Sequence, residues 1–178
     1  MSKCKLVPVT ADNITILADI NSAVLPIQYP SNSIIYKQML TAEDFCFIAY
    51  TDDNIAIGAI GCRLELNATK TAVNLLILTI AVLAPYRRSG IGSQLLQRVI
   101  DNAKQFNENA KQDGTELIES IFLHVQVNND EAIAFYTGKF GFSIKETLQN
   151  YYKKLVPPDA YILSRAMWKE RITNENDK

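Results

Sequence analysis

Two patterns of apolar positions alternate along the chain and predict a mixed α/β fold. Branched and aromatic runs bounded by turn residues indicate strands near 3–9, 45–50, 55–66, 73–83, 117–127, 142–148 and 160–167. Apolar residues at helical spacing predict helices that begin near Ile14, Asn32, Ile91 and Asn129. We expect the third helix to end near Gln105, with the polar segment 106–115 as an exposed connection. Together these elements predict one domain with a single sheet and ligands at the carboxyl ends of its central strands.

Composition and charge narrow the classes of function. The chain has 178 residues, of which 48% are hydrophobic and 21% charged, as in a folded globule. Its net charge of −1 argues against a broadly basic surface for nucleic acid or membrane. No signal-peptide or membrane-spanning run is present, and the three cysteines lack metal-site spacing, which indicates reduced thiols of an intracellular protein. We expect a domain over residues 1–168 and a disordered charged tail over 169–178.

The segment after the 73–83 strand carries the clearest chemical signal. The apolar run stops at Pro85, two arginines follow, and Gly90 and Gly92 precede a helix. Glycines let backbone N–H groups approach an anion, and a helix N-terminus adds unpaired N–H groups and a positive dipole. These features predict a pyrophosphate site. An ordinary strand-to-helix turn with solvated arginines is the alternative.

Arg87-x-x-Gly90-x-Gly92, set between a strand and a helix, resembles the signature of the GCN5-related N-acetyltransferase (GNAT) superfamily. Within it, five further segments are similar to the San-type protein N-alpha-acetyltransferases, the catalytic subunits of NatE: residues 83–88, 123–126, 132–136, 139–142 and 150–152. The similarity runs from about residue 9 to 163. It implies a single-domain α/β fold with about four helices and a mixed, largely antiparallel seven-stranded sheet whose two central strands splay apart.

The resemblance also implies acetyl-CoA as cosubstrate and no metal. The pyrophosphate would lie on backbone amides after the 73–83 strand, and the pantetheine in the splay. The implied cofactor contacts are Ile80, Val82, Arg87, Arg88, Ser89, Gly90, Ile91, Gly92, Ser93, Asn129 and Tyr136. The Tyr136 hydroxyl would lie near the thioester sulfur, where a phenol can donate to a developing thiolate. From the residues alone, a half-buried core tyrosine is the alternative.

His124, the single histidine, is the candidate base. An amine that has lost its proton attacks a thioester directly, and an imidazole can accept that proton through a water. A lone histidine on an apolar strand is often a core residue, but the resemblance places His124 at the family's catalytic position. One departure concerns Leu76, which stands where the family has a tyrosine. Either His124 acts with other waters, a hydroxyl such as that of Tyr29 or Tyr151 substitutes, or the enzyme is slow.

Two apolar loops that carry tyrosines match the family's walls for a peptide amino terminus. The implied substrate contacts are Leu25, Pro26, Ile27, Tyr29, Leu78, Tyr151, Tyr152 and Leu155. An apolar pocket flanked by tyrosine hydroxyls suits an initiator methionine and the peptide backbone behind it. We therefore expect substrates that begin with Met followed by a hydrophobic residue.

Two other functions stay open at this point. The chain could be an acetyl-CoA-binding subunit of an acetyltransferase complex with little or no activity, for which Leu76 is the main argument. It could also acetylate lysine or small amines, although the two loops contain no Asp or Glu. The resemblance implies protein N-termini and a ribosome-associated NatA-type complex as partners, in the cytoplasm and also the nucleus. No direct contact with nucleic acid or a membrane is expected.

Overall fold

The computed structural model describes residues 4–30, 32–67 and 72–167. These residues form one seven-stranded sheet in the order β1-β2-β3-β4-β5-β7-β6. The strands are β1 (Lys5–Pro8), β2 (Phe47–Tyr50), β3 (Ala56–Leu66), β4 (Val73–Val82), β5 (Ile118–Gln126), β6 (Ser143–Leu148) and β7 (Ala160–Ala166). The helices are α1 (Ile14–Val24), α2 (Ile34–Met39), α3 (Ile91–Asp113) and α4 (Asp130–Phe140), with two short 3₁₀ turns, η1 (Leu40–Phe45) and η2 (Ala84–Tyr86). The predicted fold is confirmed; the predicted tail at 169–178 lies outside the described residues.

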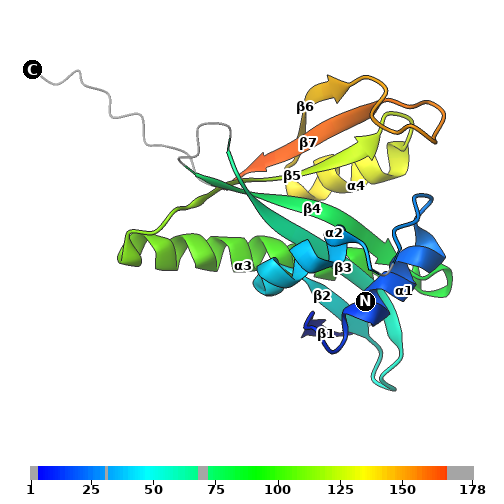
Figure 1. The fold of residues 1–178 in the computed structure, drawn as a ribbon, viewed down its shortest axis with the longest axis horizontal. Coiled ribbons are helices and arrows are strands. Elements are labelled where there is room, and N and C mark those ends of the chain that lie inside the picture. The colour runs from blue at the N-terminus through cyan, green and yellow to red at the C-terminus, as the bar shows by residue number, and fades with distance from the viewer. Residues whose placement is uncertain (1–3, 31, 68–71, 168–178) are drawn as a thin grey trace, which may run out of the picture.

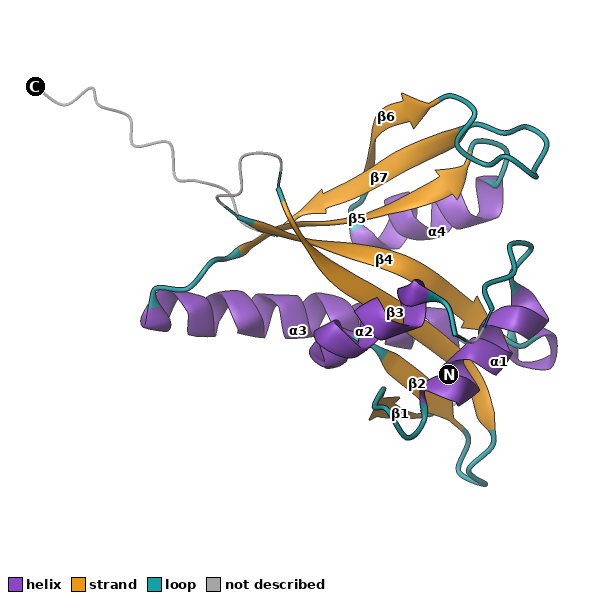
Figure 2. Ribbon diagram, viewed as in Figure 1, coloured by secondary structure: helices purple, strands orange, loops and turns teal. Residues whose placement is uncertain are grey.

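Helices cover both faces of the sheet, with α1 and α2 on one side and α3 and α4 on the other (Figures 1 and 2). The buried stripe of α3 consists of Leu95, Leu96, Val99 and Ile100, each fully inaccessible to solvent. This stripe follows the i, i+3, i+4 spacing that the sequence shows. None of the described helices is long and apolar enough to cross a membrane.

The central strands β4 and β5 form the sheet's single parallel pair, and their pairing is incomplete. The pairing ends at Ile77 and Leu123. Beyond that point β4 continues to Val82 against β3 alone, and β5 continues to Gln126 against β7 alone. Figure 1 shows the two strands diverging toward α1 and α4. The divergence is the predicted splay, and it leaves backbone groups on both inner edges without a ladder partner.

A one-residue bulge lies on β4 beside the splay. Cys62 of β3 pairs with Ile77, but its neighbour Gly61 pairs with Thr79, so Leu78 is the extra residue. Side chains alternate between faces along a strand, and a bulge reverses that alternation. Thr79 therefore points to the α1 side of the sheet, whereas an unbroken strand would turn it to the opposite side with Ile77.

Helix α3 corrects one prediction. It runs to Asp113, so the segment 106–115 is mostly helix and not an exposed connection. The buried face of this last part carries Asn107 and Ala110, which do not continue the apolar pattern of the first turns. Both ends of the Asn107 amide are hydrogen-bonded: Nδ2 donates to the Ile118 carbonyl at 2.8 Å and Oδ1 accepts from the Ile118 N–H at 2.7 Å. Gly114, with φ of 71°, then ends the helix.

Candidate active site

The predicted pyrophosphate site is a cavity of about 660 Å³ between the start of α3 and helix α4. Its lining consists of Val82, Tyr86, Arg87, Arg88, Gly90, Ile91, Gly92, Ser93, Glu131, Ala134 and Phe135. Gly90 precedes the helix with φ of 88°, a conformation that favours glycine. The first intrahelical bond runs from the Gln94 N–H to the Gly90 carbonyl, so the N–H groups of the first turn have no partner within the helix. This is the geometry of an anion site.

The arginines and the serine of this turn have different roles. The Arg87 Nε donates to the Val82 carbonyl at 3.0 Å, which fixes its guanidinium beside the end of β4. Arg88 forms an exposed ion pair with Glu131 of α4 at 3.2 Å. The Ser89 hydroxyl donates to the Tyr86 carbonyl within the turn, and Ser89 does not line the cavity. The Ser89 side chain is therefore already hydrogen-bonded within the turn. A contact between a cofactor and the Ser89 backbone stays a prediction.

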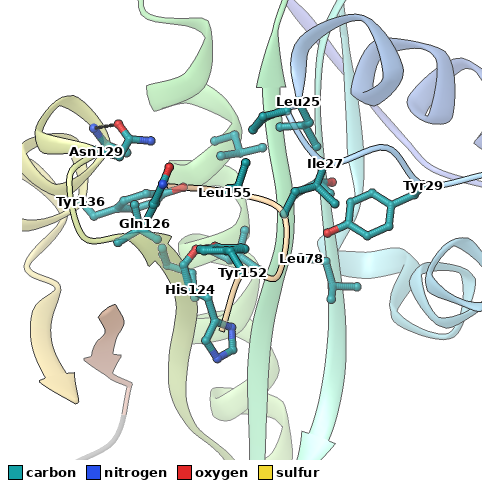
Figure 3. A pocket seen from close by; sticks show the side chains of 17 residues that line it. Leu25, Ile27, Tyr29, Leu78, His124, Gln126, Asn129, Tyr136, Tyr152 and Leu155 are labelled. Carbon is teal, nitrogen blue, oxygen red and sulfur yellow. Dashed lines mark hydrogen bonds between the residues drawn. The ribbon is translucent and has the colours of Figure 1, made fainter. Parts of the chain in front are cut away.

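A second cavity, of about 220 Å³, lies in the splay. It brings together these predicted site residues: Leu25, Pro26, Ile27, Tyr29, Leu78, Ile80, His124, Asn129, Tyr136, Tyr152 and Leu155. Figure 3 shows Leu25, Ile27 and Tyr29 on one side, Asn129 and Tyr136 on the other, and Tyr152 and Leu155 between them. Of the predicted substrate contacts, Tyr151 is not in the lining; it stacks on the His124 ring instead.

Several residues that line the two cavities were not predicted from the sequence. These are Ile77, Thr79, Leu123, Val125, Gln126 and Ala132 in the splay, and Tyr86, Glu131, Ala134 and Phe135 near the start of α3. Most are apolar residues of strands and helices whose pattern predicts only burial. The polar Gln126 has a visible role, since its Nε2 donates to the Pro157 carbonyl at 2.7 Å and ties the loop between β6 and β7 to β5.

Two residues on the α4 side of the splay were predicted to contact the cofactor. Asn129 caps α4 by accepting the Ala132 N–H at 3.1 Å. The side chain of Tyr136 is buried, and burial is the main cause that raises the pKa of its hydroxyl far above the ordinary value, with smaller contributions from Cys62 and Tyr152. The Tyr136 hydroxyl is therefore protonated at physiological pH and can donate a hydrogen bond or a proton.

The His124 ring is half-buried, and its nitrogens make no hydrogen bond with any described residue. Burial lowers the pKa of the imidazole below 6.5; the Glu65 carboxylate opposes this shift and the Arg63 guanidinium adds to it. The imidazole is therefore mostly neutral at pH 7 and can accept a proton. The Tyr152 hydroxyl donates to the His124 backbone carbonyl at 3.3 Å, which joins the loop between β6 and β7 to the base's own strand.

The tyrosines around the cavity are poor candidates for a substitute base. Burial raises the pKa of Tyr29 and that of Tyr151, and it raises the pKa of Tyr152 to about 12. All three phenols stay protonated near neutral pH and act as hydrogen-bond donors. Leu76 is 5% exposed, pairs across the sheet with Arg63 and Phe122, and does not line the cavity. Of the side chains that line the cavity, His124 is the one suited to take a proton.

Comparison with known proteins agrees with this geometry. A sheet opened at its central parallel pair, with a glycine and arginine turn at the mouth of the opening, is the arrangement that the resemblance to N-acetyltransferases implies. The sequence profile of the Acetyltransferase (GNAT) family matches residues 14–142, and the chain belongs to this family.

Two similar proteins and one similar structure cover most of the chain, and the first of them is named an N-alpha-acetyltransferase. N-alpha-acetyltransferase 50 of Danio rerio is 39% identical over 165 residues, which cover 93% of this chain and 89% of that protein. The probable N-acetyltransferase san of Drosophila melanogaster is 39% identical over 166 residues, or 93% of this chain and 82% of that protein. The structure of Arabidopsis thaliana Naa50 with the bisubstrate analogue CoA-Ac-MVNAL has a TM-score of 0.76 at 39% identity, covering 93% of this chain and 99% of that one. The chain is therefore an acyltransferase, and its homologues support N-terminal acetylation as its reaction.

Proposed function

We propose that this enzyme transfers the acetyl group of acetyl-CoA to the α-amino group of proteins that begin with Met followed by a hydrophobic residue. The observation that carries the proposal is the cavity through the splay. An apolar wall from the loop after α1 lies on one side, and the buried Tyr136 phenol lies on the other. The similar Arabidopsis Naa50 was solved with an analogue whose peptide begins Met-Val. That peptide suits an apolar wall of this kind.

The residues that line the two cavities fit acetyl-CoA. Val82 lines the cavity at the start of α3 and Ile80 lines the cavity in the splay, so one strand edge connects the two. The pantetheine arm of CoA carries two amides, which match the backbone groups of β4 that have no ladder partner beyond Ile77; the Val82 carbonyl already accepts from Arg87 Nε. At Gly92 an added Cβ would meet the Phe135 ring at 3.8 Å, so a side chain there would fill space in the first cavity. When bound, the cosubstrate supplies an acetyl thioester.

The residues of the splay can then perform direct transfer. The substrate amine, once deprotonated, forms a C–N bond with the acetyl carbon as the C–S bond breaks. His124 accepts the proton that the amine gives up, through a water. Tyr136 donates to the sulfur as it leaves as a thiolate. Tyr29 supplies a hydroxyl donor at the rim, where the peptide backbone would pass. The Tyr152 hydroxyl already donates to the His124 carbonyl, so it offers the peptide an acceptor oxygen.

A peptide library varied at its first two residues tests the proposal. Wild-type protein with acetyl-CoA should acetylate peptides that begin with Met and a hydrophobic residue, and mass spectrometry should locate the acetyl group on the α-amine. Matched peptides with a blocked N-terminus and an internal lysine serve as the control. Acetylation confined to lysine would contradict the proposed substrate.

Leu76 favours a second candidate, an acetyl-CoA-binding subunit with little activity of its own. Its buried position between Arg63 and Phe122 places no hydroxyl where the resembling family has one. Saturable binding of acetyl-CoA without acetylation of any peptide in the library would support this candidate. Multiple turnovers on any peptide would exclude it.

We further propose that the protein acts in the cytoplasm, and also in the nucleus, as part of a ribosome-associated NatA-type complex, without direct binding to nucleic acid or membranes. Cys4, Cys46 and Cys62 are free thiols, which suits a reducing compartment. Imaging of the tagged protein tests the location, and co-sedimentation with ribosomes tests the association. A tagged protein confined to a membrane fraction would contradict both proposals.

A further inference from the structure

Thr79 is the single hydroxyl-bearing residue of β4, and the bulge at Leu78 decides where it points. The bulge turns its side chain toward α1, while the residue still lines the splay cavity. Its neighbours in that wall, Ile77, Leu78 and Ile80, are apolar. The cavity therefore has one side-chain polar contact to offer from this strand. It lies just past Ile77, where β4 and β5 part.

Asn21 of α1 holds that hydroxyl. Its Nδ2 donates to Thr79 Oγ1 at 3.2 Å, and the two residues are 1% and 4% exposed. The other end of the same amide, Oδ1, has no hydrogen-bond partner among the described residues. If the oxygen and nitrogen of the Asn21 amide were exchanged, one end would still form a hydrogen bond with the Thr79 hydroxyl and the other end would still have no partner among the described residues.

The buried Asn107 provides a contrast within the same chain. Both ends of its amide are satisfied by the Ile118 backbone, as expected of a purely structural asparagine. Asn21 is equally buried but half satisfied, and a buried polar atom without a partner is costly. Its free end has no partner among the described residues, so a polar group from outside the chain can bind there. A buried water fits such a position.

The chain makes room for this arrangement at Gly61, which lies opposite Thr79 on β3. A Cβ at Gly61 would lie within 3.1 Å of Thr79 Oγ1 and would collide with Met39 of α2 at 2.4 Å. Three elements thus converge on one hydroxyl: α1 supplies the amide, β3 supplies the space and β4 supplies the bulge. A threonine that only filled space in the core would need none of these three features, because a valine of nearly the same shape would fill that space without a hydroxyl.

We propose that the Thr79 hydroxyl contacts the incoming amino group at the point of attack, and that Asn21 is a positioning residue that acts through Thr79. This inference rests on the proposed function. Leu76 offers no hydroxyl, and the phenols of Tyr29 and Tyr152 belong to the loops at the rim. Thr79 is the hydroxyl that the sheet itself fixes, so it can hold the amine in line with the acetyl group.

Steady-state kinetics on a Met-Leu peptide test the role of Thr79. Thr79→Val keeps the shape and removes the hydroxyl, so kcat should fall by about ten- to a hundredfold, with little change in binding of acetyl-CoA. Thr79→Ser should recover most of the loss. Thr137→Val is the matched control, because the Thr137 hydroxyl bonds only the Ile133 carbonyl within α4. An unchanged kcat in Thr79→Val would overturn the proposal.

The role of Asn21 needs a readout that separates positioning from folding. Asn21→Leu should lower kcat as Thr79→Val does, and the double variant should be no slower than the slower single, since the two residues act as a unit. Asn107→Leu should lower the melting temperature and leave kcat, measured well below it, unchanged. Additive losses in the double variant would overturn the proposal even if one single variant folds poorly. Wild-type protein that acetylates no peptide would instead refute the proposed function, and this inference with it.

Discussion

The ring of Tyr151 lies flat against the imidazole of His124, with centroids 4.6 Å apart and planes inclined by 13°. Tyr151 belongs to the loop between β6 and β7, and 44% of it is exposed. Phe122, two residues before His124 on β5, meets the same imidazole edge-on at 6.0 Å. Two aromatic rings therefore fix the orientation of the base, and one of them comes from the loop expected to contact the peptide.

Removal of the Tyr151 ring should slow the reaction without affecting acetyl-CoA. An aromatic contact of this kind contributes roughly 0.5–1.5 kcal/mol, so Tyr151→Ala should lower kcat by about two- to tenfold. Tyr151→Phe keeps the stacking surface and should retain most of the activity. Steady-state kinetics with saturating acetyl-CoA compare the two. Equal losses in both variants would show that the hydroxyl matters and the stacking does not.

His124 should titrate below pH 6.5, because burial disfavours the charged imidazole. Its neutral form is the base, so kcat should fall as the pH drops through this pKa. The chain has one histidine, so NMR of a single imidazole signal measures the value directly. Glu65→Gln removes the carboxylate that raises the pKa and should lower it further, whereas Arg63→Gln should raise it. A titration at or above 6.5 in wild type would contradict the burial argument.

Replacement of His124 tests its role as the general base. A general base contributes typically about 10²–10⁴ in rate, so His124→Ala should reduce kcat by that order. Binding of acetyl-CoA, followed by calorimetry, should stay close to wild type, which separates the chemical role from cofactor binding. A turnover number unchanged by His124→Ala would remove His124 from the mechanism.

Leu76 allows a gain-of-function test. It is buried between Arg63 and Phe122, so a larger ring there crowds the sheet and should cost about 1–3 kcal/mol of stability. Leu76→Tyr should nevertheless raise kcat, because it returns a hydroxyl to the face of the sheet that His124 shares. Leu76→Phe brings the same bulk without the hydroxyl and should lower the melting temperature without a gain in rate. Equal rates in the two variants would show that the hydroxyl at this position is not limiting.

The sequence predicted those features that depend on local chemistry. The glycines and arginines predicted a strand-to-helix turn, and the structure places Gly90 and Gly92 there with a left-handed φ at Gly90, while anion binding at this turn stays a prediction. The strands also follow from local composition, because β-branched residues are enriched in strands. The two walls of the splay are separate loops, and the family resemblance brought them together before any geometry was known.

Features that depend on the register between strands could not be predicted from the sequence. The run Leu75-Leu76-Ile77-Leu78 is apolar at every position, so no alternation marks the bulge that turns Thr79 toward α1. The end of α3 was missed for a similar reason, because a buried asparagine and alanine look like an exposed polar segment. Tyr151 was expected in the cavity wall, and its stack on His124 depends on how the loop after β6 folds back.

Glu131 places a negative charge at the site expected to bind a diphosphate. Its carboxylate pairs with Arg88 at 3.2 Å, and both residues line the cavity at the start of α3. Their side chains are 72% and 82% exposed, so the pair adds little to stability. Glu131→Gln should lower the melting temperature only slightly, because it removes one of two acidic side chains from the first turn of α4. The free Arg88 and the lost repulsion should tighten acetyl-CoA binding by roughly two- to fivefold at low salt, with a smaller gain at high salt.

Calorimetric titration of acetyl-CoA at two salt concentrations measures this effect. Glu108→Gln is the control, because it breaks an exposed pair with Lys111 farther along α3 without changing the cavity. Weaker binding in Glu131→Gln would mean that the ion pair holds Arg88 in its binding position, and the proposed competition would then be wrong. A gain that is insensitive to salt would also contradict it, since repulsion between exposed charges is screened by ions.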